Sequence, residues 1–416
     1  MRRGRRTPSP RRSAGRVLVT DAGRGAAISI IRSLGERGYD VVAADFRPRS
    51  PGFYSRYTSA RLRYPPPQVA PQRAVATLRE AARDLQVDLI VPVTEELVLP
   101  LSEARTDFAG ICALALPEPQ ALARAADKLA TLELARGLGV PTPRTALAAT
   151  AAEALEAASS LGWPVVLKPR ASRVNRDGGA IDAYEVGYAG DAEGLAEQME
   201  SFEGRCEVLL QEYYPGEAHG VELLLHRGRP LAAFQHRRLR EVPITGGASS
   251  FRESVALDPE LYDHSVRLLA ALEWTGLAMV EFKVGREGPK LMEINGRIWG
   301  SLPLAVKSGM DFPARLAELY LSGPPENGHG ADTSYEVGVR SRNLDLEVLW
   351  IASTLRRKRR FPFLPPPRRR DALAAGLRLL SSADGFDVLS RHDPRPGLAE
   401  IAGVASKLRR KVADGR

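Results

Sequence analysis

Two apolar stretches late in the chain each carry a single glutamate. Glu281 lies between Val280 and Phe282, and Glu293 lies two residues before Asn295. The alternation of apolar residues predicts two antiparallel strands joined by a glycine-containing turn, so the two carboxylates and the amide can converge on one face. Oxygen donors of this kind suit Mg²⁺ or Mn²⁺. Two solvent-facing strand glutamates are the alternative interpretation.

Two lysines add positive charge. Lys168 ends the apolar stretch WPVVLK, directly before Pro169 and a polar loop, and Lys128 lies near the middle of a helical pattern over 118–140. A lysine at the end of a strand can reach a phosphate as a point charge. It can equally be a strand-end lysine that keeps its ammonium group in water.

The segment Gln211-Glu-Tyr-Tyr-Pro-Gly216 is a strand that meets a Pro-Gly pair. Backbone N–H and C=O groups are left without ladder partners where such a strand ends, and they can contact the edge of an adenine ring. An ordinary strand end is the alternative.

The scaffold for these residues begins with a regular alternation over 17–117. Apolar β-type stretches alternate with helical patterns at 17–20, 28–34, 41–45, 73–84 and 88–93. This alternation is typical of a parallel sheet covered by helices. The turn at 21–25 lacks the GxGxxG fingerprint of a dinucleotide site, and a tight turn accounts for its glycines.

The middle of the chain mixes helices with antiparallel strands. One helix is expected over 118–140, and hairpins are expected over 221–236 and 276–295. A break rich in proline and glycine at 323–331 separates a helical C-terminal portion.

In order and spacing these features resemble the ATP-grasp superfamily, and most closely its carbamoyl-phosphate-synthase-like carboxylate–amine ligases of unassigned substrate. The resemblance covers roughly residues 17–325. It rests on the two lysines, the segment 211–216 and the series Glu281, Glu293, Asn295 and Arg297. Supporting fragments are DLIVPVTE at 88–95, LGVPTP at 138–143, and TGGAS at 245–249 followed by Arg252 and Glu253.

The resemblance implies α/β plus α+β architecture. It predicts the ATP-grasp fold with an N-terminal Rossmann-like pre-ATP-grasp domain, two α+β subdomains that clamp ATP, and a helical C-terminal extension. The expected parts are a disordered basic arm at 1–16, the pre-ATP-grasp domain at 17–117, the ATP-grasp domain at 118–325 with a lid at about 145–210, and the extension at 332–416.

The resemblance also implies roles for single residues. Lys128 and Lys168 would contact ATP phosphates, and Lys168 would also take part in catalysis. Arg297 would stabilise the transferring phosphoryl group and the acyl phosphate. The adenine hinge would be formed by Gln211, Glu212 and Tyr214, and the metal would be held by Glu281, Glu293 and Asn295.

Two positions depart from the family pattern. The loop at 170–180 has its glycines late, so Arg173 and Arg176 are expected to do part of the work of the usual backbone N–H groups. Ala218 stands about where an acid often binds the ribose, and Glu217 or His219 is expected to replace it.

The implied activity is the ATP-dependent activation of a carboxylate as an acyl phosphate, which an amine captures with release of ADP and phosphate. Two alternatives stay open. One is a non-catalytic ATP-binding regulatory protein, and the other is a bicarbonate-using carbamoylating or carboxylating enzyme. The resemblance leaves the carboxylate and the nucleophile unassigned.

Composition bounds the surroundings of the protein. With 44% hydrophobic and 26% charged residues the chain is typical of a globular protein, and its two cysteines fit a reducing cytoplasm. The net charge is +9, but fifteen basic residues at 2–16, 356–360 and 368–370 leave the remainder net negative. No sequence-specific nucleic-acid contact is expected. A weak contact of the basic helix at 345–357 with an anionic membrane surface and a homodimer are open alternatives.

Overall fold

The structure is a computed structural model. It describes residues 14–170, 173–175, 181–183, 186–244, 246–325, 330–356, 364, 367–379 and 384–413, and of 173–175 and 181–183 it describes the backbone alone. Most of the basic arm, the side chains of Arg173 and Arg176, and the basic run after Arg356 therefore lie outside the described residues.

The helices follow the sequence in this order: α1 (Gly25–Glu36), η1 (Pro51–Tyr54), α2 (Pro71–Asp84), α3 (Glu95–Glu103), η2 (Arg105–Phe108), α4 (Pro119–Ala126), α5 (Lys128–Gly137), α6 (Ala151–Leu161), α7 (Ala192–Met199), α8 (Pro259–Ala271), α9 (Leu302–Lys307), α10 (Phe312–Ser322), α11 (Leu344–Arg356), α12 (Arg369–Arg378) and α13 (Pro394–Ala413).

The strands are β1 (Arg16–Val19), β2 (Asp40–Asp45), β3 (Thr58–Arg63), β4 (Leu89–Val91), β5 (Ala113–Leu114), β6 (Thr145–Ala148), β7 (Val165–Pro169), β8 (Arg173–Asn175), β9 (Ile181–Ala183), β10 (Gly187–Ala189), β11 (Val208–Glu212), β12 (Glu217–His226), β13 (Arg229–Val242), β14 (Ala248–Ser254), β15 (Gly276–Gly285), β16 (Gly288–Asn295), β17 (Arg340–Arg342) and β18 (Gly385–Phe386).

The N-terminal sheet is parallel throughout, with strand order β3-β2-β1-β4-β5. Strands of such a sheet are buried on both faces, and Val17, Leu18 and Val19 of β1 are fully buried. The alternation in the sequence therefore predicted this layer correctly.

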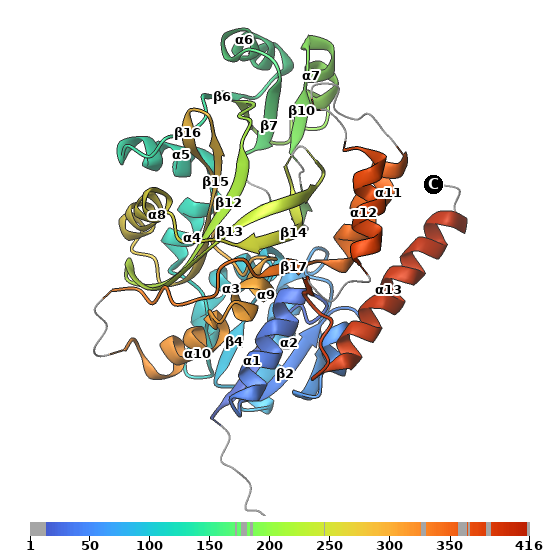
Figure 1. Ribbon diagram of the computed structural model, residues 1–416. Coiled ribbons are helices and arrows are strands. Elements are labelled where there is room, and N and C mark those ends of the chain that lie inside the picture. The colour runs from blue at the N-terminus through green and yellow to red at the C-terminus, as the bar shows by residue number, and fades with distance from the viewer. Residues whose placement is uncertain are drawn as a thin grey trace, which may run out of the picture.

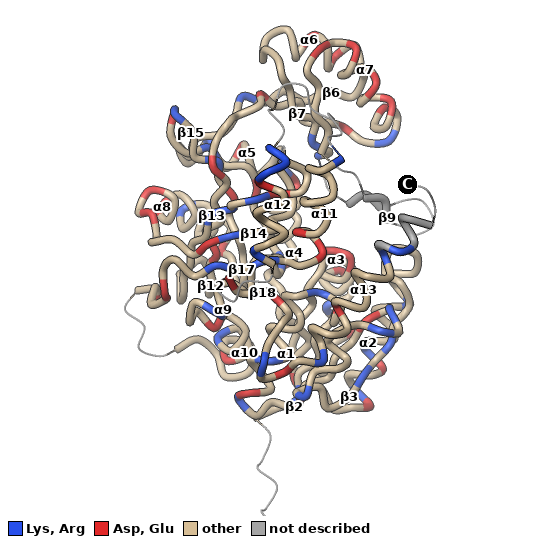
Figure 2. Tube along the Cα trace, turned by 45° about the vertical axis from the view of Figure 1, so that its right-hand side comes forward, with Lys and Arg blue, Asp and Glu red and all other residues tan. Residues whose placement is uncertain are grey.

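The lid is a separate small layer at one end of the molecule (Figure 1). Its antiparallel sheet has the order β10-β7-β11-β6, and α6 and α7 pack on it. Side chains such as Leu167, Leu195 and Leu210 form a core that is distinct from the other cores. Figure 2 shows acidic residues along α6 and α7 at the outer end of this layer.

The central sheet has the order β16-β15-β12-β13-β14-β17-β18, antiparallel as far as β17 and parallel between β17 and β18. Its apolar side chains share cores with the N-terminal sheet. Leu18 and Phe282 belong to one shared core, and Val19 and Met279 belong to the other. The N-terminal and central layers are thus packed together, whereas the lid has its own core.

The C-terminal part lies against the central sheet and the N-terminal layer (Figure 1). Helix α11 packs on α12 and on β14, and α13 packs on η1. Trp350 of α11 is buried beside Ala372 and Ala375. The helices were expected from the sequence, whereas β17 and β18 were not.

One expected element is corrected. The pattern over 118–140 predicts a single helix, but the structure has two, α4 and α5, with a break at Asp127. The Asp127 carboxylate accepts hydrogen bonds from the backbone N–H groups of Leu129 and Ala130, so it caps the start of α5. This cap makes Lys128 the first residue of a helix instead of a mid-helix residue.

Among the helices of the described ranges, none combines the length and the apolarity that crossing a bilayer requires. The sheets confirm the expected α/β plus α+β class, with a parallel N-terminal sheet and antiparallel lid and central layers.

Candidate functional site

The hairpin of β15 and β16 brings the two glutamates together. Glu281 and Glu293 are register partners on neighbouring antiparallel strands, and Asn295 lies two residues beyond Glu293 on the same face. The Asn295 amide donates to Glu281 Oε1 at 3.0 Å and to Glu293 Oε1 at 3.2 Å. The three predicted metal-binding residues therefore converge on one point.

This donor set fits a hard cation. The assignment of oxygen and nitrogen in an amide is interchangeable, and the turned amide of Asn295 would present a third oxygen beside the two carboxylates. One of the two carboxylates also pairs with a side-chain cation, because Arg238 Nη2 lies 2.5 Å from Glu281 Oε1. The described residues contain no group of three His, Cys, Asp or Glu that could bind a metal.

Burial and neighbouring charges act differently on the two carboxyl groups. Burial raises the pKa of Glu281, against the opposing effect of Arg238. Burial also raises the pKa of Glu293, but Lys128, Lys168 and Arg297 lower it by more, so its pKa lies below the ordinary value. Glu293 is therefore held ionised in the middle of three cations.

The two predicted phosphate-binding lysines approach this carboxylate from different elements. Lys168 lies at the end of β7 in the lid, and burial lowers its pKa to about 8, with the charges of Lys128 and Glu293 acting in opposite directions. Lys128 begins α5 and is buried, and its backbone N–H donates to the carbonyl oxygen of Arg170. The break between α4 and α5 thus places Lys128 close to the end of β7, which carries Lys168.

A cavity of about 370 Å³ lies between the lid sheet and the central sheet. Seven of the predicted site residues line it: Lys168, Gln211, Glu212, Tyr214, Glu281, Glu293 and Arg297. A smaller cavity of about 80 Å³ adjoins it, lined by Lys128 and Asn295 together with Glu293 and Arg297. Among the predicted residues, His219 lines neither of these two cavities.

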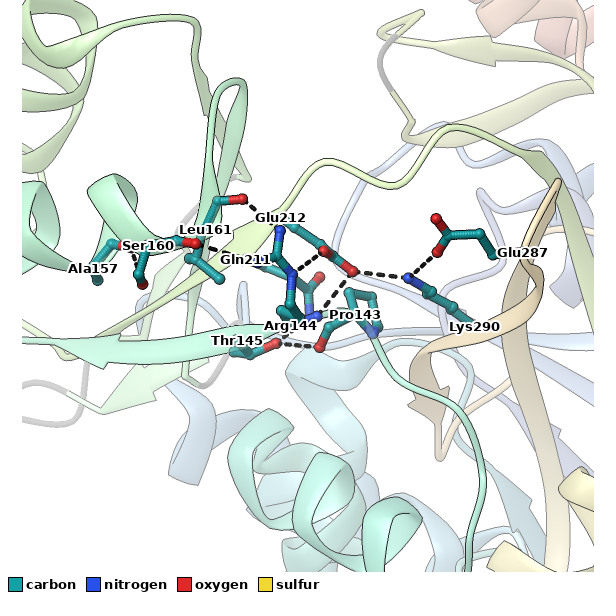
Figure 3. Close-up of polar contacts among 10 residues, drawn as sticks. All are labelled: Pro143, Arg144, Thr145, Ala157, Ser160, Leu161, Gln211, Glu212, Glu287 and Lys290. Atoms are coloured by element: carbon teal, nitrogen blue, oxygen red, sulfur yellow. Dashed lines mark hydrogen bonds and ion pairs between the residues drawn. The ribbon is translucent and has the colours of Figure 1, made fainter.

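The hinge segment after β11 is held by side chains, as Figure 3 shows. The Glu212 carboxylate accepts hydrogen bonds from Arg144 Nε at 2.6 Å and from Lys290 Nζ at 2.9 Å. These cations outweigh the effect of burial and lower the pKa of Glu212. The backbone N–H groups of Glu212 and Tyr213 also donate, to the carbonyl oxygens of Arg144 and Pro164, so the start of the hinge is fixed by both its side chain and its backbone.

Two further hinge residues are also fixed. Gln211 donates to Thr145 Oγ1 at 3.0 Å, and the Tyr214 hydroxyl donates to the carbonyl oxygen of Gly288 at 2.7 Å. The Lys290 ammonium lies 4.2 Å from the centre of the Tyr214 ring. The first contact ties β11 to β6 within the lid, and the two contacts of Tyr214 tie the segment after β11 to the hairpin that carries the carboxylates.

The expected ribose contact at 217–219 is not brought to the cavity by its polar side chains. His219 Nε2 lies 3.0 Å from Glu217 Oε2, and His219 Nδ1 lies 3.2 Å from Gln235 Nε2. Ala218, between them, does line the cavity. In strands, neighbouring side chains point to opposite faces, which accounts for the alternation.

Four charged residues of the cavity wall were missed from the sequence. They are Arg238, Glu241, Arg252 and Lys283. The predicted hairpin ended at 236, whereas β13 continues to Val242 and carries two of them. Arg252 lies on β14, which the sequence did not predict because its residues are mostly small and polar. The three arginines at 237, 238 and 240, directly after the predicted hairpin, were the available signal.

Comparison with known proteins supports the fold. Residues 205–342 match the family model described as "ATP-grasp in the biosynthetic pathway with Ter operon". The large chain of carbamoyl phosphate synthase from Thermus thermophilus is 25% identical over 327 residues, which are 76% of this chain and 29% of that protein. The chain therefore spans less than a third of that relative.

Solved structures show the same arrangement. A biotin carboxylase from Campylobacter jejuni, in complex with β,γ-ATP, superposes with a TM-score of 0.61 and 17% identity over 78% of this chain and 74% of that chain. An L-amino acid ligase from Bacillus licheniformis superposes with a TM-score of 0.58 and 16% identity over 75% of each chain.

The chain has the ATP-grasp fold, and its residues 205–342 match an ATP-grasp family model. Ligases and carboxylases occur among its relatives. The ATP-grasp chain described here has the parallel N-terminal sheet and the antiparallel lid and central sheets between which the cavity lies.

Proposed function

We propose that this protein uses Mg-ATP to convert a carboxylate into an acyl phosphate, which an amine then captures, with release of ADP and phosphate. The observation that supports this best is the convergence of Glu281, Glu293 and Asn295 where two adjoining cavities meet, the larger of which is also lined by Lys168 and the hinge. That set can neutralise a polyphosphate and orient it, and a phosphoryl transfer needs little else from the protein.

The residues would divide the work as follows. Glu281, Glu293 and Asn295 would hold Mg²⁺, which when bound neutralises phosphate charge and lowers the barrier to transfer. Lys128 and Lys168 would bind phosphate oxygens as point charges. The backbone of the hinge after β11 would contact the adenine ring, while the Glu212 side chain keeps that hinge in place.

The reaction proceeds in two displacement steps. An oxygen of the carboxylate attacks the γ-phosphorus as the bond to ADP breaks, and the amine then attacks the acyl carbon as phosphate leaves. Arg297, which lines the cavity, would stabilise the negative charge that develops on the transferring group. Closure of the lid would exclude water, which otherwise competes with the amine for the acyl phosphate.

A trapping experiment tests this proposal directly. The purified protein is incubated with Mg-ATP, hydroxylamine and a panel of amino acids and other carboxylates, and ADP and hydroxamate are measured. An acyl phosphate gives one hydroxamate for each ADP. Release of ADP without hydroxamate across the whole panel would contradict an acyl phosphate intermediate.

Bicarbonate belongs in the same panel. The relatives include a carbamoyl phosphate synthase and a biotin carboxylase, so a bicarbonate-using reaction is the second candidate. ADP release that depends on bicarbonate and on no other carboxylate would favour it. ATP binding without ADP release under any condition would favour a regulatory role.

A further inference from the structure

A short segment at 384–393, here called the C-terminal strap, carries three buried aspartates. Each lies against one arginine of a distant element. Asp384 contacts Arg342, Asp387 contacts Arg252 and Asp393 contacts Arg32. Asp387 is 2% exposed and Asp393 is 2% exposed. The strap therefore fastens the central sheet to α1 through ion pairs that are shielded from water.

Arg252 is the one member of these three pairs that lines the large cavity. Its side chain is 1% exposed. It donates from Nη1 to the carbonyl oxygen of Ser249 at 3.0 Å, and from Nη2 to the carbonyl oxygen of Gly300 at 3.1 Å and to Asp387 Oδ2 at 2.5 Å. A guanidinium group has five N–H donors, and its Nε here is buried without a partner.

An unsatisfied buried donor at a cavity wall favours a ligand that supplies an acceptor. Leaving such a group without a partner is costly, and a planar guanidinium matches the oxygens of a carboxylate or a phosphate. Arg252 lies on β14, which is separated from the carboxylate-bearing β15 and β16 by β13 and β12. Its register partner on β13 is Arg238, which contacts Glu281, so Arg252 lies beside the residues proposed to hold Mg-ATP, as a carboxylate that attacks the γ-phosphate requires.

Asp387 is itself held in a fixed place. Its Oδ1 accepts a hydrogen bond from Ser341 Oγ at 2.7 Å, and its backbone N–H donates to the carbonyl oxygen of Arg342 at 2.9 Å. The start of α1 packs against it so closely that a Cβ on Gly25 would lie 3.3 Å from the Asp387 Cβ. The carboxylate thus has one orientation toward the Arg252 guanidinium.

We propose that Arg252 binds the carboxylate group of the second small-molecule substrate, and that Asp387 of the C-terminal strap is the positioning residue that holds Arg252 for this contact. The proposal rests on the ligase function proposed above and names the subsite for its carboxylate. The strap lies beyond residues 205–342, which the family model matches, so this part of the site is supplied by the C-terminal portion.

The first experiment uses acetate as the probe and needs no turnover. Thermal unfolding is followed in the presence of Mg-ADP while sodium acetate replaces sodium chloride at constant ionic strength. Acetate bound to the folded protein raises its Tm, and the rise grows with the acetate concentration. We expect the rise in the wild type to be lost in Arg252→Gln and reduced in Asp387→Asn.

Asp393→Asn is the matched control, because it removes the same charge from the same strap at a contact outside the cavity. It is expected to lower Tm in both salts and to keep the acetate-dependent rise. An equal acetate effect in Arg252→Gln and the wild type, or no effect in the wild type, would overturn the subsite.

The second experiment uses any carboxylate that gives hydroxamate in the trapping assay. Arg252→Lys and Asp387→Asn are expected to raise the KM for that carboxylate roughly 10- to 100-fold, the usual cost of one charge-assisted contact, and to leave the KM for ATP unchanged. Equal KM values for the carboxylate would overturn the subsite and leave the ligase standing. Acetate binding at Arg252 without hydroxamate from any carboxylate would overturn the ligase and leave an anion site.

Discussion

Replacing Glu293 by glutamine removes one negative charge from the proposed metal site and keeps an oxygen donor of the same size. The carboxylate of Glu293 lies among Lys128, Lys168 and Arg297, whose charges lower its pKa. Its loss acts in opposite directions on two ligands. It weakens the binding of Mg²⁺, but it also removes a charge that repels phosphate. We therefore expect Glu293→Gln to weaken ATP binding only when Mg²⁺ is present.

The size of the effect follows from Coulomb's law. Two unit charges about 4 Å apart interact by about 4 kcal/mol at an effective dielectric constant of about 20, and a divalent ion doubles the charge while water and the amide oxygen recover part of the loss. A net loss of about 3 kcal/mol of binding free energy raises the dissociation constant of ATP roughly 100-fold. Asn295→Ala removes a donor without a change of charge, so a smaller loss is expected.

Calorimetric titration of ATP in excess Mg²⁺ and in excess EDTA measures both affinities without any second substrate. The ratio of the dissociation constant in EDTA to the dissociation constant in Mg²⁺ is expected to fall roughly 100-fold in Glu293→Gln. Glu287→Gln is the matched control, since Glu287 lies in the turn of the same hairpin with its side chain 75% exposed. An unchanged ratio in a folded Glu293→Gln variant would refute the metal assignment.

Three further predictions concern other charged groups. Lys168→Ala is expected to raise the dissociation constant of ATP roughly 10- to 100-fold by calorimetry, because a phosphate loses its point charge; an unchanged value would make Lys168 a strand-end lysine only. Burial and the charges of Asp387 and Asp345 raise the pKa of Glu400 to about 7, so its ionisation in the folded state costs stability. That cost is absent below about pH 4.5 and complete above about pH 7, so Glu400→Gln is expected to be more stable than the wild type in urea at pH 8, by at most about 3 kcal/mol, and equal to it near pH 4.5. Salt-sensitive sedimentation with anionic vesicles, lost when 356–360 are neutralised, tests the membrane contact, and protein that stays in the supernatant at low salt would contradict it.

The predicted residues that the structure brings to the large cavity include three that share one property. Lys168, Glu281 and Glu293 each lie in or at the end of a clearly apolar strand, so the pattern of the strand fixes where the side chain points. Their neighbours in space then follow from the order of the elements. For Lys128 the predicted helix was correct, but the break before it was not predicted. The capping role of Asp127 becomes visible only when its hydrogen-bond partners are known.

The cavity wall on the other side could not be predicted in the same way. Strand β13 carries Arg238 and Arg240 in its last part, and arginines usually predict positions that are exposed to solvent. They are accommodated there because Glu281 and Glu347, on distant elements, neutralise them. Pairing of this kind is decided by tertiary structure, which a single sequence does not display.

The same reasoning changes how the C-terminal portion is understood. Buried charges are tolerated when they are paired, and removing one partner leaves the other uncompensated. Arg252 and its partner Asp387 are separated by 135 residues and are both buried. Arg342, in the strand between them, is held by Glu347 and Asp384, which also belong to the C-terminal portion. Loss of this portion would remove Asp387 and leave the buried Arg252 of the cavity wall without its partner, so the C-terminal strap belongs to the scaffold of the proposed active site.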